Sequence, residues 1–145
     1  MSKKSELHKK LLQSITQKID TLQKEIDAMN DSLNTATKSS AGDKHETSRA
    51  MIQLEQERVG KQLSKIVHMR DLANTISPDE THDSNKLGSL VKTANGEFYI
   101  SVAMGMIDSV FCMSPTTPLA QVLLGKKKGE STQFNGKSIE ILELI

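Results

Sequence analysis

Apolar residues recur at steps of three and four over the first part of the chain. They are Leu7, Leu11, Ile15, Ile19, Leu22, Ile26, Met29 and Leu33. This spacing places the apolar residues on one face of an α-helix, as in a coiled coil or a helical bundle. Neither proline nor glycine interrupts the run, so we expect one long helix that ends near Thr37, before the segment 39–42.

A second helical run follows Gly42 and ends before Ser77 and Pro78, because proline cannot continue the helical hydrogen bonds. Its apolar positions are again close to a heptad repeat, and they are Met51, Ile52, Val59, Leu63, Ile66, Ala73 and Ile76. Two long helices around a short turn predict an antiparallel hairpin over residues 1–76, with its tip near residues 39–46. At about 1.5 Å per residue, such an arm is on the order of 50 Å long.

The pattern changes after the polar segment 77–86, which we interpret as a linker. Short strand-like runs follow, at residues 87–93, 97–103, 110–113, 131–134 and 138–144. Thr117 and Pro118 are typical of a helix start, and Gly125 of a helix end. We therefore expect an α+β chain, in which the N-terminal antiparallel coiled-coil hairpin precedes a small, mostly antiparallel sheet domain with one helix at residues 87–145.

Composition and charge narrow the function classes. The 145 residues carry a net charge of +1 and only 3% aromatic residues, so a nucleobase-stacking surface is not expected. Residues 1–76 hold thirteen Lys or Arg and ten Asp or Glu, a net of +3, whereas residues 77–145 hold six and eight, a net of −2. The one cysteine, Cys112, lies in an apolar run and is expected to be a buried thiol. We expect a cytoplasmic protein with neither a signal peptide nor a membrane span.

The turn between the helices carries the first candidate site. Asp43 and Glu46 are three residues apart, so at the start of a helix both carboxylates point to the same side and could supply ligands to Mg²⁺. The same pair also fits an acidic helix cap, and this alternative stays open. Lys44 and Arg49 lie near these acids and are candidates for contacting phosphates, or are simply solvated cations.

A second charged group is Lys126-Lys127-Lys128-Gly129-Glu130. It lacks the glycine spacing of a phosphate-binding loop, and cations after a helix end also complement the helix dipole. The sequence contains neither a nucleophile elbow nor the zinc-binding spacings of Cys and His. Pattern and spacing alone therefore indicate an interaction protein and not a self-contained enzyme.

Two motifs together resemble the bacterial Gre transcript-cleavage factors. The run Thr117-Pro118-Leu119-Ala120, followed by Leu123-Leu124-Gly125-Lys126-Lys127 and Gly129-Glu130, is similar to the C-terminal signature of that family. At the turn, Gly42-Asp43-x-x-Glu46 matches the tip motif Gly-Asp-x-x-Glu of the family. The resemblance spans nearly the whole chain, in the order hairpin, linker, sheet domain.

The resemblance implies a specific role. Gre factors bind RNA polymerase through a C-terminal domain of FKBP-like fold and pass the coiled coil down the secondary channel to the active site. There the tip carboxylates help to hold a second Mg²⁺, so that the polymerase cleaves the 3′ end of its own backtracked RNA. Carried over, Asp43 and Glu46 would be the ligands of a Mg²⁺ shared with the polymerase. In that setting we expect Lys44 and Arg49 to contact the extruded RNA, which is our own hypothesis and not a family assignment. Thr117, Pro118, Leu119, Gly125 and Lys126 would lie at the polymerase-binding surface of a monomeric factor that binds no cofactor alone.

Some positions depart from the family pattern. The family commonly continues the tip as Asn-Ala-Glu-Tyr, where this chain has Thr47-Ser48-Arg49-Ala50. A Gre-fold regulator that occupies the channel without promoting cleavage is therefore a second hypothesis. A prolyl isomerase would need an aromatic-lined pocket, for which the sheet domain offers only Phe98, Tyr99, Phe111 and Phe134. A coiled-coil adaptor that dimerises in parallel is a fourth hypothesis, which the break at residues 39–42 disfavours.

Overall fold

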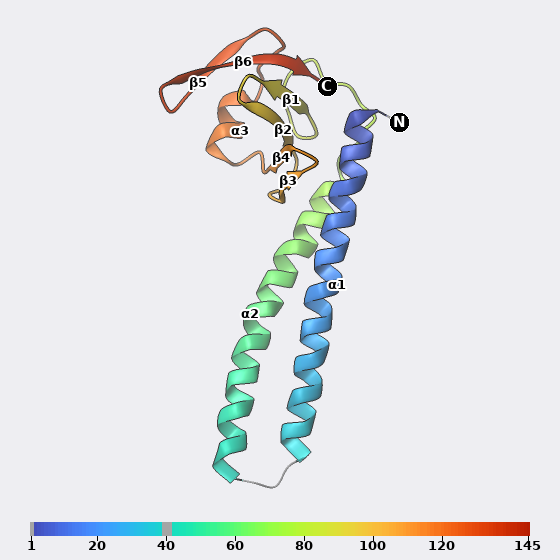
Figure 1. The fold of residues 1–145 in the computed structure, drawn as a ribbon, viewed down its shortest axis with the longest axis vertical. Helices are drawn as coiled ribbons and strands as arrows, with labels where there is room; N and C mark the ends of the chain where they lie inside the picture. Colours follow the sequence, from blue (N-terminus) through green and yellow to red (C-terminus); the bar gives the residue numbers. More distant parts are fainter. Residues whose placement is uncertain (1, 39–41) are drawn as a thin grey trace. The chain divides into compact units, whose positions relative to one another are not determined.

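The computed structural model describes the backbone of residues 2–38 and 42–145, and the side chains of residues 2–35 and 47–145. Two long helices, α1 (Lys3–Lys38) and α2 (Gly42–Asn74), precede the strands and a short helix, α3 (Pro118–Leu123) (Figure 1). The chain divides into two compact units. The helical unit consists of residues 15–68, and the sheet unit consists of residues 1–14 and 69–145.

In the helical unit, α1 and α2 lie side by side and run antiparallel (Figure 1). The apolar residues buried in this unit are Ile15, Leu22, Val59 and Ile66. They come from both helices at seven-residue spacing, which is the repeat of a coiled-coil seam. Gln56 Nε2 also donates a hydrogen bond to Asn30 Oδ1, one polar contact between the helices. The predicted antiparallel helical hairpin is therefore confirmed for these residues.

The sheet unit contains six strands within the described range. They are β1 (Leu90–Thr93), β2 (Gly96–Ile100), β3 (Gly105–Ile107), β4 (Val110–Met113), β5 (Ser131–Phe134) and β6 (Lys137–Leu144). Their order in the sheet is β3-β4-β2-β1-β6-β5, and every neighbouring pair is antiparallel except β2 with β4. The prediction of a mostly antiparallel sheet with one helix after the hairpin is confirmed.

Strand β3 was not predicted, because its turn lacks the usual residues. A two-residue turn with both residues in the left-handed region normally contains Asn-Gly or Asp-Gly. Here Asp108 (φ 49°) and Ser109 (φ 67°) occupy these positions between β3 and β4. The Asp108 carboxylate also forms an exposed ion pair with Lys10 of α1. The turn therefore forms without the glycine by which such turns are recognised in a sequence.

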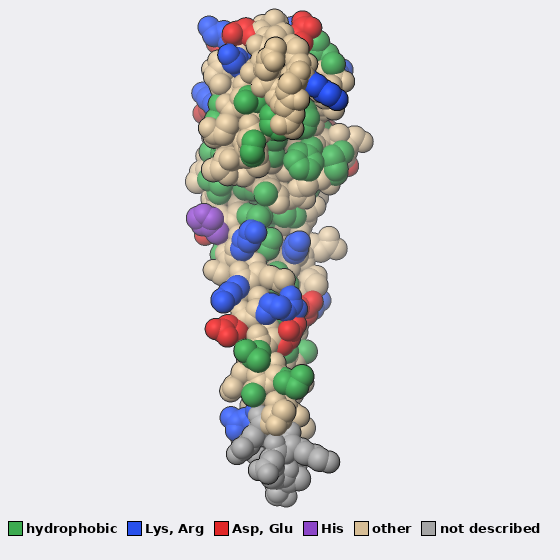
Figure 2. Space-filling model, turned by 90° about the vertical axis from the view of Figure 1, so that its left-hand side faces the viewer, with side chains coloured by type: hydrophobic (Ala, Val, Ile, Leu, Met, Phe, Trp, Pro, Cys, Tyr) green, Lys and Arg blue, Asp and Glu red, His purple; other side chains and the backbone are tan. Residues whose placement is uncertain are grey.

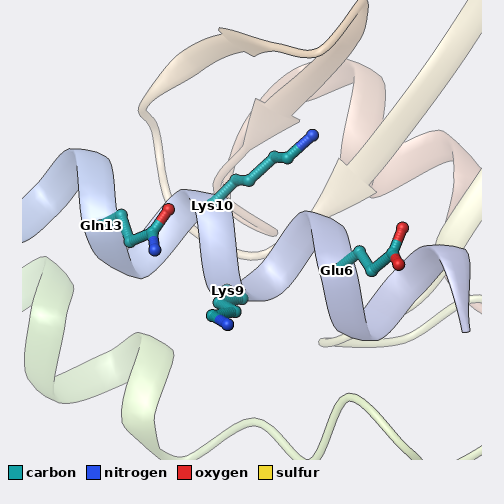
Figure 3. A pocket seen from close by; sticks show the side chains of 4 residues that line it. All are labelled: Glu6, Lys9, Lys10 and Gln13. Atoms are coloured by element: carbon teal, nitrogen blue, oxygen red, sulfur yellow. The ribbon is translucent and has the colours of Figure 1, made fainter. Parts of the chain in front are cut away.

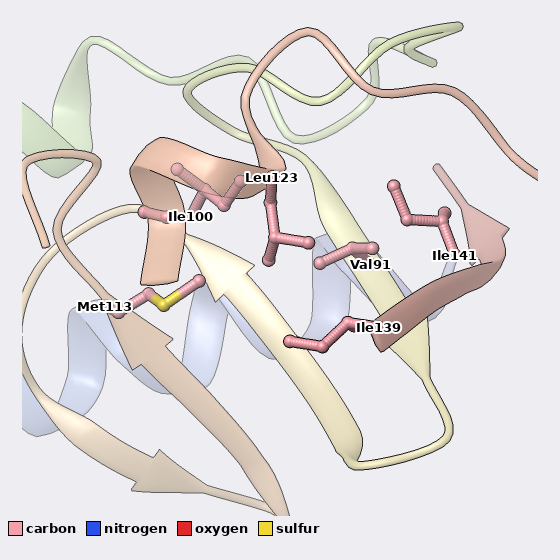
Figure 4. Packing of buried hydrophobic residues seen from close by; sticks show 7 residues of the cluster. Val91, Ile100, Met113, Leu123, Ile139 and Ile141 are labelled. Carbon is pink, nitrogen blue, oxygen red and sulfur yellow. The ribbon is translucent and has the colours of Figure 1, made fainter. Parts of the chain in front are cut away.

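Helix α3 covers one face of the sheet. Seven buried residues form the core on this side (Figure 4), and they are Val91, Ile100, Met113, Ala120, Leu123, Ile139 and Ile141. The strand residues among them alternate with residues of the opposite face, as expected for a sheet that is covered on both sides. The helix contributes Ala120 and Leu123, both fully buried.

The first turns of α1 cover the opposite face. Leu7 and Leu11 of α1 are buried together with Tyr99 and Cys112 of the strands. His8 Nδ1 lies 2.8 Å from the Tyr99 hydroxyl, and both side chains are buried. Lys3 pairs with Glu97 of β2 at 2.6 Å. The start of α1 is therefore an integral part of the sheet unit.

The segment between α2 and β1 has neither helix nor strand, yet α1 holds it by polar contacts. The fully buried Lys4 ammonium donates hydrogen bonds to the carbonyls of Glu80 and Ile145. Ser5 Oγ donates to an Asp79 carboxylate oxygen at 2.6 Å. His82 is buried as well, with Nδ1 2.6 Å from Ser89 Oγ. The segment 77–86, predicted as a linker, therefore belongs to the sheet unit.

The helices in the described part of the chain are too polar to cross a membrane, since none contains a sufficiently long apolar stretch.

Truncating the α3 contact should destabilise the sheet unit. Leu123→Ala removes a fully buried side chain, and we expect the free energy of unfolding to fall by about 3 kcal/mol. Leu142→Ala is the matched control, because Leu142 is 39% exposed and should cost less than about 1 kcal/mol. Urea unfolding can be followed by the fluorescence of Tyr99, because the chain has one Tyr and no Trp. Equal costs for the two variants would contradict this packing.

The stability of the sheet unit should depend on pH through His8. Burial lowers the pKa of His8 below its ordinary value of 6.5, and a hydrogen bond with the Ala73 backbone opposes this only in part. The unfolded chain therefore takes up the proton first as the pH falls. The free energy of unfolding should be highest above pH 6.5 and decrease as the pH falls towards the pKa of the folded state.

The measurement compares urea unfolding at several pH values for the wild type and His8→Gln. The variant lacks this titrating group, so its stability should fall less on acidification. His82 contributes in the same direction in both proteins, because burial and then Lys4 and Lys86 lower its pKa. An identical pH dependence of the two proteins would show that His8 does not contribute.

Candidate functional site

The predicted polymerase-binding residues lie at the two ends of α3. Thr117 is the N-cap, whose Oγ1 accepts a hydrogen bond from Ala120 N at 3.3 Å. Pro118 is the first helical residue, where its missing N–H costs no intrahelical hydrogen bond. Gly125 follows the other end of the helix with φ +79°, a conformation that favours glycine. All five residues therefore lie either in the first turn of one helix of about 9 Å or just beyond its ends.

The C-terminal end of α3 is fixed to the segment before β1 by backbone hydrogen bonds. Gly125 N donates to the Asn85 carbonyl at 2.8 Å, and Asn85 N donates to the Lys126 carbonyl at 2.9 Å. The Asn85 side chain is buried and adds a weaker hydrogen bond from Nδ2 to the same Lys126 carbonyl at 3.3 Å. These contacts hold the Lys126 backbone while its side chain stays partly exposed.

The three consecutive lysines follow this fixed point. Lys127 and Lys128 are exposed, and the turn after them is closed by Glu130, whose carboxylate accepts a hydrogen bond from Lys127 N at 3.0 Å. Pro118 at the opposite end of α3 is exposed and Leu119 is half-buried. The structure thus places an apolar element and a basic element at opposite ends of the same short helix.

An exposed apolar surface lies on the same face of the sheet as α3. In the strand register Phe98 of β2 is opposite Phe111 of β4, which is opposite Met106 of β3. The two phenyl rings contact edge to face, with centroids 6.5 Å apart. Phe111 is 41% exposed and Met106 is 63% exposed. Phe98 and Leu119 both pack against the core beneath α3, so this surface adjoins the helix.

Sequence reasoning missed this surface for a physical reason. Alternation along a strand indicates which residues share a face, and Phe98 and Phe111 do share a face with core residues. Whether a face is covered depends on the element above it. Helix α3 spans six residues, Pro118–Leu123, and its buried residues contact only part of that face.

The aromatic side chains of the sheet unit do not converge on one pocket. Tyr99 is fully buried beneath α1, whereas Phe98 and Phe111 lie on the opposite face. One hollow of about 390 Å³ on α1 is open to solvent (Figure 3). Its lining consists of Glu6, Lys9, Lys10 and Gln13. Such a polar, open lining differs from the enclosed apolar pockets that bind small molecules.

The tip acids fall outside the described side chains. Helix α2 begins at Gly42, so Asp43 and Glu46 lie in its first turn, but the side chains of Asp43, Lys44 and Glu46 belong to the segment that is not described. Arg49 is described and is exposed. Among the described residues, no group of three or more His, Cys, Asp or Glu side chains is arranged to hold a metal ion.

A solved structure described as the transcription factor Gfh1 is similar to this chain, with 14% sequence identity and a TM-score of 0.37. The alignment covers 92% of this chain and 92% of that chain. No protein-family model and no curated protein matches this sequence.

The capping role of Thr117 can be separated from any role in binding. Thr117→Ala removes the oxygen that accepts the Ala120 N–H, and we expect a loss of about 1 kcal/mol in the free energy of unfolding. Thr117→Ser keeps the hydroxyl and should unfold like the wild type. Urea unfolding monitored by Tyr99 fluorescence provides the measurement. If the alanine and serine variants were equally stable, Thr117 would not cap α3 in solution.

Proposed function

We propose that this chain is a Gre-like transcription elongation factor. It binds RNA polymerase through the sheet unit, inserts its coiled coil into the secondary channel and stimulates cleavage of backtracked RNA. The observation that carries this proposal is the position of the Gly-Asp-x-x-Glu motif, at which α2 begins with Gly42. The acids thus lie in the first turn of the second helix of an antiparallel pair, where a motif that must reach a distant site would be.

The tip carboxylates would complete the ligand set of a Mg²⁺ at the polymerase active site. Asp43 and Glu46 are hard oxygen donors, the kind that Mg²⁺ takes in proteins, so the donor set fits. When bound, Mg²⁺ supplies charge stabilisation and an activated water for phosphodiester hydrolysis at the polymerase active site. The factor alone needs only two carboxylates, because the polymerase provides the other ligands. In this scheme the polymerase is the enzyme and this chain is its accessory.

The sheet unit would provide the affinity. Pro118 and Leu119 of α3 and the apolar surface of Phe98, Phe111 and Met106 lie on one face of the sheet. An apolar patch bordered by polar and charged residues is typical of a protein-binding surface. Lys126 at the far end of α3 adds a positive charge that would favour an acidic segment of the partner.

One observation favours a second function, a channel-binding regulator that does not stimulate cleavage. The residues after the tip acids are Thr47, Ser48, Arg49 and Ala50, where the resembled family commonly has a further acid and an aromatic ring. Arg49 is exposed, so it brings a positive charge near the acids. A cation there would weaken the attraction of the tip for Mg²⁺. A cleavage-stimulating factor would release short 3′ RNA fragments, whereas a regulator without this activity would release none.

The experiment uses bacterial RNA polymerase stalled in a backtracked complex with Mg²⁺ and RNA labelled at its 3′ end. The wild-type protein should release short 3′ fragments, whereas Asp43→Asn with Glu46→Gln should reduce the rate at least about 100-fold and keep the affinity for polymerase. Glu57→Gln, at an exposed acid of α2, is the matched control and should cleave like the wild type.

The outcomes separate the two functions. Wild-type protein that binds tightly but releases no fragments would support the regulator and overturn cleavage stimulation. Wild-type protein that does not bind polymerase would overturn both.

A further inference from the structure

Three exposed lysines come from two distant segments of the sheet unit. Lys127 and Lys128 follow α3, whereas Lys86 lies in the segment before β1. The backbone of Asn85, the neighbour of Lys86, is bonded to the segment after α3: its carbonyl accepts a hydrogen bond at 2.8 Å and its N–H donates one at 2.9 Å. The two segments therefore lie side by side, and we call the three lysines the lysine cluster. In Figure 2, Lys and Arg side chains project from the rim of the sheet unit, whereas hydrophobic side chains gather nearer its centre.

The backbone that carries the cluster is held in place on two sides. Gly129 N donates to the Ile141 carbonyl at 2.8 Å, and Ile141 N donates to the Glu130 carbonyl at 2.9 Å, which ties the loop after α3 to β6. Glu130 N also donates to the Lys127 carbonyl at 3.0 Å. The loop is thus fixed to β6 at one end and to Asn85 at the other, so its backbone needs little ordering when a ligand binds.

The acids near the cluster neutralise it only in part. Glu130 turns its carboxylate back to the loop, where it accepts a hydrogen bond from Lys127 N at 3.0 Å. Glu140 of β6 points to the other face of the sheet, because side chains alternate along a strand and both of its neighbours belong to the core beneath α3. If Lys126 is counted with the cluster and Asp83 with Glu130, four positive and two negative charges leave a net charge of +2.

The chemistry of the cluster favours phosphate as its ligand. Lysine is a compact point charge that suits phosphate oxygens, whereas carboxylate recognition favours the forked guanidinium of arginine, and the one arginine of the sheet unit is Arg70 on α2. Residues 126–130 include no aromatic or apolar side chain that could stack on a base or enter a lipid surface. A nucleic-acid duplex presents phosphates at high density and keeps its bases stacked inside, so it fits this cluster.

We propose that Lys86, Lys127 and Lys128 bind the phosphate backbone of double-stranded nucleic acid without reading its sequence. Each lysine ammonium would lie against one phosphate of the duplex. The inference does not rest on the proposed function, because these three residues are separate from those proposed to bind polymerase. The contact should be weak and should depend on salt, because each neutralised phosphate releases the cations that surround it.

The test measures binding of the full-length protein to fluorescein-labelled duplexes of DNA and of RNA by fluorescence anisotropy, over a series of KCl concentrations. With three phosphate contacts, the logarithm of the association constant for DNA should fall with the logarithm of the salt concentration at a slope of about −2.7. The cluster variant combines Lys86→Gln, Lys127→Gln and Lys128→Gln. We expect it to bind at least about tenfold more weakly at the lowest salt, with a slope closer to zero.

The matched control replaces three other exposed lysines of the sheet unit, in the combination Lys9→Gln, Lys92→Gln and Lys137→Gln. It has the same net charge as the cluster variant, so a difference between the two reports the position of the charges and not their sum. Both variants should unfold in urea like the wild type, because all the replaced side chains are exposed.

Weaker duplex binding by the cluster variant, with the control variant like the wild type, supports the proposal. The duplex that binds more tightly then identifies DNA or RNA as the source of the phosphates. Equal affinities of the two variants overturn the proposal, because the cluster then has no special role. A wild type that binds neither duplex at the lowest salt also overturns it. Tighter binding to single-stranded RNA or to a glutamate-rich peptide than to either duplex overturns it as well, because the partner is then of another kind.

Discussion

The sheet unit depends on the burial of both faces of one small sheet. Helix α3 spans six residues and can cover only one face. The other face carries Tyr99 and Cys112, which are fully buried only because the first turns of α1 lie over them. His8 Nδ1 and the Tyr99 hydroxyl share a hydrogen bond in this interface, so a polar group that would be costly to bury unpaired becomes a specific contact. The N-terminal turns of α1 thus belong to the core of a unit whose strands begin about eighty residues later along the chain.

Because α3 is short, part of the sheet face that it covers remains exposed to water. A short α3 buries Ile100 and Met113 but leaves Phe111 and Met106 in contact with water on the same face. Exposure of an edge-to-face aromatic pair is unfavourable for an isolated domain and favourable for one that binds a partner. The ends of α3 are also fixed independently, by the Thr117 cap and by the hydrogen bonds of Asn85 with Gly125 and Lys126. Because these hydrogen bonds already fix the helix ends, little conformational entropy would be lost when a partner binds at the adjoining apolar surface.

In the helical unit, the buried apolar residues all lie in the seam between α1 and α2. Its seam is built from aliphatic residues at heptad spacing, and the polar pair of Gln56 and Asn30 adds a contact that favours one register. The apolar residues of α2 are divided between the seam and the outer position of Met51 and Leu54, whereas the buried residues of α1 follow one stripe. Stability requires only the seam.

The sequence by itself determined both long helices, the reversal between them, strands β4 and β5 with their observed bounds, and the cap and closing glycine of α3. These features are encoded locally, by periodicity and by the backbone preferences of Thr, Pro and Gly. The motifs at Asp43 and Glu46 were likewise visible in sequence, although their side chains lie outside the described residues. Only the tertiary structure decided that β3 forms around Asp108 and Ser109, that α1 covers Tyr99, and that Phe111, Met51 and Leu54 stay exposed. These outcomes depend on which surfaces distant segments bring together, and no short stretch of sequence contains that information.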